Sequence, residues 1–103
     1  MTAEVIPFPE RPSRQELEAR VRALAQNTGN INFEAPHFQE RLQERGILMR
    51  QVLDVLRNGE AIHGPTKDQW GDWRIKMRRL TAGRRVQVVV AVRETELIAI
   101  TVI

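Results

Sequence analysis

The amino-acid sequence predicts an α+β domain in which N-terminal helices pack on a three- to four-stranded antiparallel sheet. Apolar residues recur at helical spacing as far as about residue 58. From residue 73 onward they alternate with polar residues, as in strands with one buried face. The predicted strands follow one another with short connections, which favours antiparallel hairpins. A run of helices followed by a run of strands is typical of α+β folds.

The first 32 residues are expected to form an arm and one extra helix ahead of the main domain. The proline-rich start should be a flexible arm. Ser13 and Glu16 have the spacing of a capping box, which predicts a helix from there to about Gln26. Turn-forming residues end this helix, and a short extended piece is expected next. The chain therefore divides into residues 1–13, residues 14–32 and a main domain, residues 33–103.

Two further helices are predicted before the strands. Pro36 suits the first turn of a helix that runs to about Arg45, where Gly46 ends it. A third helix is predicted over residues 49–58, because its apolar residues share one face. The connection between these two helices is very short, so they should be packed neighbours.

Three strands are predicted in the last third of the chain. Residues 73–78 alternate apolar and basic side chains, so this strand should have one buried and one basic face. Residues 84–92 and 96–103 should form the next two strands, and a weaker strand is expected at 61–63. The last strand is apolar on both faces. We expect it either to be covered by the N-terminal helix or to pair with a second copy of the chain in a homodimer.

The composition restricts the classes of function. The chain has 103 residues, enough for one domain, and no cysteine, which excludes a disulfide framework and a thiolate metal site. It has no membrane-length apolar segment and no signal-peptide pattern, so we expect a cytoplasmic protein that does not bind membranes. The net charge is +3, but residues 64–93 contain eight Lys or Arg and only two Asp or Glu. This concentration favours an anionic partner, either RNA or an acidic protein.

One group of candidate catalytic residues lies on the second predicted helix. His37, Arg41 and Arg45 are spaced four apart, so they should line up along the edge of the core, partly shielded from water. A histidine there can act as a general acid or base, and two arginines can hold a phosphate. The alternative is structural: the arginines pair with Glu40 or Glu44, and the histidine only begins the helix.

A second group of candidate residues lies on the strand predicted at residues 73–78 and around the turn that follows it. These residues would bind RNA through its phosphates. A solvated sheet face is the alternative, since only Trp70 and Trp73 could stack on bases. His37 and His63 are too far apart in the sequence to suggest a metal site, and no cofactor motif is present. The predicted phosphate-binding residues are Arg74, Lys76, Arg78, Arg79, Arg84 and Arg85.

The sequence from residue 33 onward resembles a bacterial family known as domain of unknown function 4258. The resemblance covers residues 33–103, and Leu48 and Met49 depart from it where the family has a helix-capping Ser, Thr or Asn. It rests on His37, Glu40-Arg41, Glu44-Arg45-Gly46-Ile47, Val52, Leu56, Gly59, the strand Val86 to Val90, and Ile100-Thr101-Val102.

The family's layout is similar to that of RelE-like and BrnT-like toxins, which cleave RNA without a metal on a small sheet backed by helices. The resemblance implies a metal-independent endoribonuclease without cofactors, of the mRNA interferase type. His37 would be the acid or base, Arg41, Arg45 and Arg78 would contact phosphate, and an antitoxin would be a partner. The rival hypothesis is a non-catalytic basic module that binds RNA, or a phage or mobile-element inhibitor of a protein partner. A third is a structural subunit without a ligand.

The position of His37 relative to the basic strand should separate these hypotheses. A histidine beside residues 74–78 would favour catalysis, because acid/base chemistry requires it within reach of the bound phosphate. A histidine that points into solvent away from these residues would favour binding without turnover.

Overall fold

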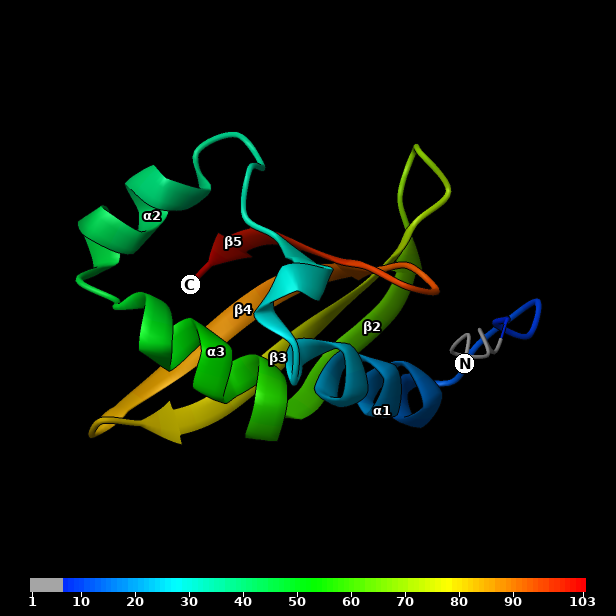
Figure 1. Ribbon diagram of the computed structural model, residues 1–103, viewed down its shortest axis with the longest axis horizontal. Coiled ribbons are helices and arrows are strands. Elements are labelled where there is room, and N and C mark those ends of the chain that lie inside the picture. Colours follow the sequence, from blue (N-terminus) through cyan, green and yellow to red (C-terminus); the bar gives the residue numbers. More distant parts are fainter. Residues whose placement is uncertain (1–6) are drawn as a thin grey trace.

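The computed structural model describes residues 7–103 and confirms the α+β class (Figure 1). Three helices precede most of the sheet, as the sequence predicts. In chain order the elements are α1 (Arg14–Ala25), a 3-10 turn (Thr28–Asn30), β1 (Ile31–Asn32), α2 (Phe38–Arg45), α3 (Met49–Asn58), β2 (Glu60–Lys67), β3 (Trp73–Thr81), β4 (Arg84–Val92) and β5 (Leu97–Val102).

The sheet has five strands and is mixed, so it differs from the predicted three- to four-stranded antiparallel sheet by one short parallel strand, β1. The strand order is β1-β5-β4-β3-β2, and β1 runs parallel to β5 while the other pairs are antiparallel. β1 is only two residues long and pairs with a strand far along the chain, so local sequence could not assign it to the sheet. β2 continues through Gly64-Pro65, which from sequence indicates a strand end.

Gly64 allows β2 to continue because it lies very close to β3. Its φ is +95°, and a Cβ added there would lie 2.6 Å from the carbonyl oxygen of Arg74. Only glycine fits such a position without displacing backbone.

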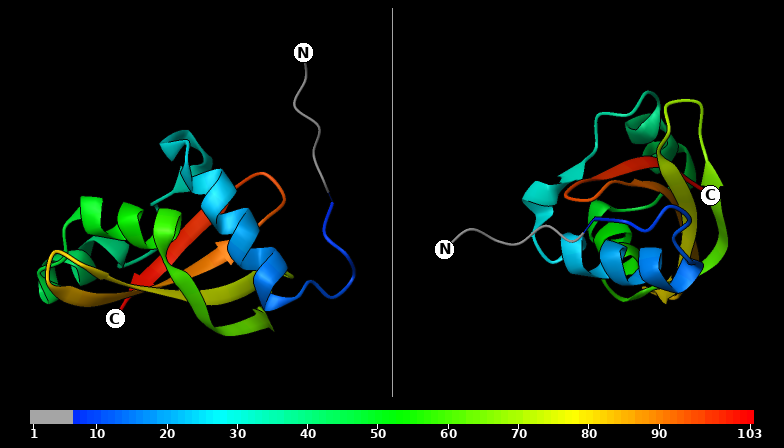
Figure 2. Two further views of the ribbon diagram at one scale, coloured as in Figure 1. Left: turned by 90° about the horizontal axis from the view of Figure 1, so that it is seen from below. Right: turned by 90° about the vertical axis from the view of Figure 1, so that its right-hand side faces the viewer.

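Helices α1 and α3 cover one face of the sheet and form the core with it (Figures 1 and 2). Each fully buried aliphatic or aromatic side chain stabilises the fold by about 1.5–3 kcal/mol relative to an exposed one. No helix within residues 7–103 is long and apolar enough to cross a membrane. The core includes Leu17, Val21, Phe38, Leu42, Val52, Val55, Leu56, Ile75, Met77, Val86, Val88, Val90 and Leu97.

Helix α1 has the predicted capping box and is tied to the start of β2. Ser13 Oγ accepts from the backbone N–H of Glu16, and Glu16 Oε1 accepts from the N–H of Ser13. Arg22 donates twice to the carbonyl oxygen of Gly59, at 2.6 and 3.0 Å. Glu18 accepts from the backbone N–H of Ala61. These bonds dock the extra helix onto the main domain.

The predicted N-terminal arm is described only from residue 7. Residues 1–6 lie outside the described residues. In the remainder of the arm, Pro12 is buried, and Phe8 packs against the core beneath the guanidinium of Arg20, 4.6 Å from the ring centroid.

The terminal strand β5 lies inside the sheet, between β1 and β4. Leu97, Ala99 and Val102 are buried in the core. β1 pairs with β5 at Leu97 and Ile98, and α2 contacts the same strand. Pairing of β5 with a second copy of the chain remains a prediction.

The loop between β2 and β3 is held in shape by Asp68. One oxygen of its carboxylate accepts from the backbone N–H groups of Trp70 and Asp72, each at 2.9 Å. The other accepts from Arg74 Nε at 3.0 Å. Burial alone would raise the pKa of Asp68, but the hydrogen bonds from Asp72, Arg74 and Trp70 outweigh burial and lower it.

We expect Asp68→Asn to destabilise the protein at pH 7 by about 1–2 kcal/mol, because the amide oxygen can still accept from the two backbone N–H groups, but an NH2 group replaces the oxygen that accepts from Arg74 and the negative charge is lost. The folded-state pKa of Asp68 is depressed, so its stabilising effect is present above about pH 4. It disappears as the pH falls through the folded-state value. Urea unfolding of both proteins between about pH 7 and pH 2 should therefore show the difference shrinking toward zero. A difference that does not change with pH would contradict this role.

Candidate nucleic-acid interface

Helices α1 and α3 contact β3 and β4 from one side of the sheet and lie in front of the strands in the left view of Figure 2, whereas α2 contacts β5. The opposite face therefore has no helix over its centre. We call it the open face. Directly paired residues of neighbouring strands share a face, so the register defines its members. On β3 and β4 the pairs are Arg74 with Ala91, Lys76 with Val89, Arg78 with Gln87, and Leu80 with Arg85.

Four of the six predicted phosphate-binding residues lie on the open face: Arg74, Lys76, Arg78 and Arg85. The other two lie on the helix side and make structural contacts. Arg79 forms an ion pair with Asp54 at 3.0 Å, and Arg84 donates to the carbonyl oxygen of Gly46 at 3.1 Å. Burial would raise the pKa of Asp54, but hydrogen bonds from Asn58, Thr81 and Arg79 lower it overall. Strand alternation explains the division, since residues 78 and 79 must point to opposite faces.

The cations of the open face differ in whether a carboxylate already holds them. Arg74 is paired with Asp68 at 3.0 Å, and Arg78 with Glu60 at 2.7 Å. Lys76 and Arg85 have no ion pair or hydrogen bond with any other side chain in the described part of the chain. Their charges are therefore available to an anionic ligand.

His63 is a member of the open face that sequence reasoning missed as a candidate for RNA chemistry. It is exposed, and it lies directly across from Lys76 in the pairing of β2 with β3. Directly paired side chains have Cβ atoms about 5 Å apart. The sequence contained no signal for this neighbourhood, because β2 is bulged on both sides of His63 and its register cannot be read from alternation.

The predicted catalytic group on α2 is more exposed than expected. His37 Nδ1 lies 2.9 Å from a carboxylate oxygen of Glu40, and the two side chains are 73% and 67% exposed. Arg41 pairs with Glu44 at 3.6 Å, and Arg45 is exposed at the end of the helix. The prediction that this group is shielded at the core edge was wrong. Phe38 and Leu42 are the buried residues of α2. Arg41 lies about 100° from Leu42 around the helix and Arg45 about 60°, while His37 precedes the helix, and all three side chains are exposed.

The α2 group and the open-face cations lie on different parts of the molecule. Helix α2 contacts β5, which is two positions from β3 in the sheet, or about 10 Å in its plane. Within residues 7–103, no hydrogen bond or ion pair joins His37, Arg41 or Arg45 to residues 74–78.

His37 has a backbone conformation that is rare for a residue other than glycine. Its φ is 68° and ψ is 1°, in the left-handed region, and it directly precedes the first residue of α2. The helix thus begins two residues after Pro36 and not at it. Such a conformation costs of order 1–3 kcal/mol and is concentrated at functional sites.

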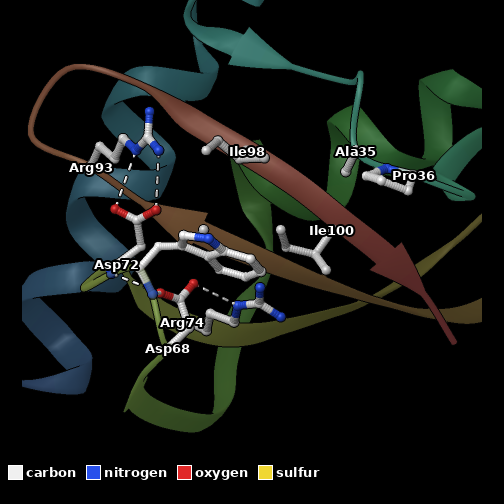
Figure 3. Close-up of a pocket in the computed structure, with 10 residues that line it drawn as sticks. Ala35, Pro36, Asp68, Asp72, Arg74, Arg93, Ile98 and Ile100 are labelled. Atoms are coloured by element: carbon white, nitrogen blue, oxygen red, sulfur yellow. Dashed lines mark hydrogen bonds and ion pairs between the residues drawn. The ribbon is translucent and has the colours of Figure 1, made fainter.

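A pocket of about 350 Å³ opens on one end of the open face (Figure 3). Ala91, Ile98 and Ile100 supply its apolar side chains. Two loops flank it: Ala35 and Pro36 from the segment before α2, and Trp70 with its neighbours from the β2–β3 loop.

The charged residues around the pocket are paired with one another. Arg74 pairs with Asp68, and Arg93 makes two bonds of 3.2 Å to the carboxylate of Asp72 (Figure 3). The hydrogen bond with Asp72 raises the pKa of Arg93. Glu96 also contacts Arg93, at 3.3 Å. Each arginine at the rim is therefore already neutralised by a carboxylate, unlike Lys76 further along β3 and Arg85 at the far end of β4.

No metal-binding arrangement is found in the described residues, where no group of three or more His, Cys, Asp or Glu side chains could hold an ion. A search of the curated proteins gave no match, and a search of the solved structures gave none. A family model described as "Domain of unknown function (DUF4258)" matches residues 35–103, which hold α2, α3 and the four long strands. The chain belongs to this family.

Proposed function

We propose that this chain is a toxin-like cytoplasmic protein that binds single-stranded RNA across its open face. The observation that carries the proposal is the pair of cations, Lys76 and Arg85, that have no ion-pair partner among residues 7–103 and lie on a sheet face with no helix over its centre. Positive side chains along such a face bind the phosphate backbone without reading sequence. The exposed indole of Trp70, at the edge of the same face, supplies an aromatic surface of the kind single-strand binders use.

Binding is supported more directly than cleavage, because His37 is exposed on α2 and paired within its own helix. One observation supports cleavage as a second function. His37 has left-handed backbone and directly follows Pro36, which lines the pocket on the open face. In a RelE-like arrangement, His37 would take the proton of a ribose 2′-hydroxyl as that oxygen attacks the phosphorus, and arginines would stabilise the added negative charge. The bond from phosphorus to the 5′-oxygen of the next nucleotide would then break, and that oxygen would leave with a proton from a protonated group, which yields a cyclic phosphate.

We expect replacement of the two free cations to weaken RNA binding and reduce its salt dependence. For single strands, the slope of log K against log salt changes by about 0.7 for each phosphate contact. Lys76→Gln with Arg85→Gln should therefore lower the magnitude of the slope by about 1.4, measured by fluorescence anisotropy with a labelled single-stranded RNA.

Arg50→Gln is the matched control for each single variant, Lys76→Gln or Arg85→Gln, because Arg50 is also exposed and has no partner among residues 7–103, but lies on α3 behind the sheet. An equal loss in this control would indicate a general charge effect and contradict the interface. Wild-type protein that binds no RNA but retains an acidic protein partner would support the inhibitor hypothesis.

We expect any cleavage to persist in excess EDTA and to require His37. His37→Asn is the sharper variant beside His37→Ala, since asparagine tolerates left-handed backbone and keeps the start of α2 intact. Gel analysis of labelled RNA should show cleavage by wild type and none by either variant, with binding retained.

His63, the histidine on the open face, provides a comparison for the His37 variants. Loss of cleavage in His63→Ala but not in the His37 variants would transfer the acid/base role to β2 and contradict the assignment to α2. No cleavage by wild type, with salt-sensitive binding retained, would leave a binding protein only.

A further inference from the structure

The pocket on the open face has the size and lining of a site for one flat organic group. Its volume of about 350 Å³ is at the lower end of the range for small-molecule sites, which suits a ligand of one ring system. Its apolar lining comes from Ala91, Ile98 and Ile100, and these side chains face the pocket because β4 and β5 leave this side of the sheet without a covering helix.

The charges at the rim favour an uncharged group inside the pocket and not a phosphate. Arg74 and Arg93 are each held by a carboxylate, at 3.0 and 3.2 Å. A phosphate placed here would approach Asp68 and Asp72 as closely as the arginines, so attraction and repulsion would largely cancel.

The aromatic wall of the pocket is both exposed and held in position. Trp70 is 71% exposed, so most of its indole surface is open to a ligand. The Asp68 carboxylate fixes the backbone at Trp70 through a 2.9 Å hydrogen bond. With its backbone held, the exposed indole can stack on a flat ring without the loop having to order first, which reduces the conformational entropy lost on binding.

The free cations begin close to the pocket. Lys76 lies two residues beyond Arg74 along β3, a distance of about 7 Å, and points to the same side of the sheet. A strand of nucleic acid with one base in the pocket would place its neighbouring phosphates over Lys76 and, further along, Arg85. The pocket would thus accept a base, and the cations would accept the phosphates, of the same nucleotide chain.

We infer that the pocket is a base-binding subsite, which takes one unpaired base of a single-stranded RNA and stacks it on Trp70. The inference rests on the proposed function and adds where a base is held.

The test separates stacking from phosphate contact by salt dependence. Trp70→Ala should weaken binding of a labelled single-stranded RNA by about 5- to 150-fold, the range for loss of one base–aromatic stack. Because no charge changes, the slope of log K against log salt should stay as in wild type. Trp70→Phe should recover most of the affinity. Leu48→Ala is the matched control, since Leu48 is a 52% exposed apolar side chain just before α3, outside the open face, and its removal should have no effect on binding.

An RNA of the same length with abasic positions throughout provides the second measurement. It has the same phosphates, so it should bind wild type about as weakly as the intact RNA binds Trp70→Ala, and it should bind the variant and wild type equally. Equal affinity of wild type and Trp70→Ala for the intact RNA, with binding still salt-dependent, would overturn the base-binding subsite alone. Wild-type protein that binds no RNA would overturn both proposals. Circular dichroism melting of each variant checks that the fold is retained.

Discussion

The antiparallel pairing of β3 with β4 is the constraint on which both faces of the sheet depend. The pairing runs from Trp73 opposite Val92 to Thr81 opposite Arg84 without a bulge. It places Ile75 and Met77 under the helices and Lys76 on the open face. A slip of one residue would exchange the two sets of side chains, burying charges against α3. The hydrophobic core and the arrangement of cations are therefore set by the same register.

The pocket shows how the chain creates a binding surface from parts with no role in the core. Its loops come from segments about 30 residues apart, before α2 and after β2, and flank it on opposite sides, with Ile98 and Ile100 of β5 between them (Figure 3). The loop after β2 owes its shape to the carboxylate of Asp68, which is 90% removed from solvent and accepts from two backbone N–H groups. Such charge-assisted bonds are stronger than neutral ones, so the loop can hold an exposed tryptophan in place.

Much of the basic character of the chain serves the fold. Arg22 holds the carbonyl of Gly59, Arg57 that of Ala25, and Arg84 that of Gly46. Each of these bonds joins elements that are distant in sequence and satisfies a backbone group at the end of an element. The excess of arginine is thus a poor guide to ligand binding by itself. The informative cations are those that the fold leaves without a partner.

The sequence by itself determined the α+β class, the three helices and the three strands after residue 72, because hydrophobic periodicity and capping act over a few residues. It also placed Lys76 and its neighbours on one face, since alternation along a strand is a local property. Only the tertiary structure decided that β1 joins β5 in parallel, that His63 lies beside Lys76, and that α2 leaves its basic side chains in solvent. Those facts depend on strand pairing across the chain and on helix docking. Both depend on contacts between segments that are far apart in the sequence, and local sequence patterns do not reveal such contacts.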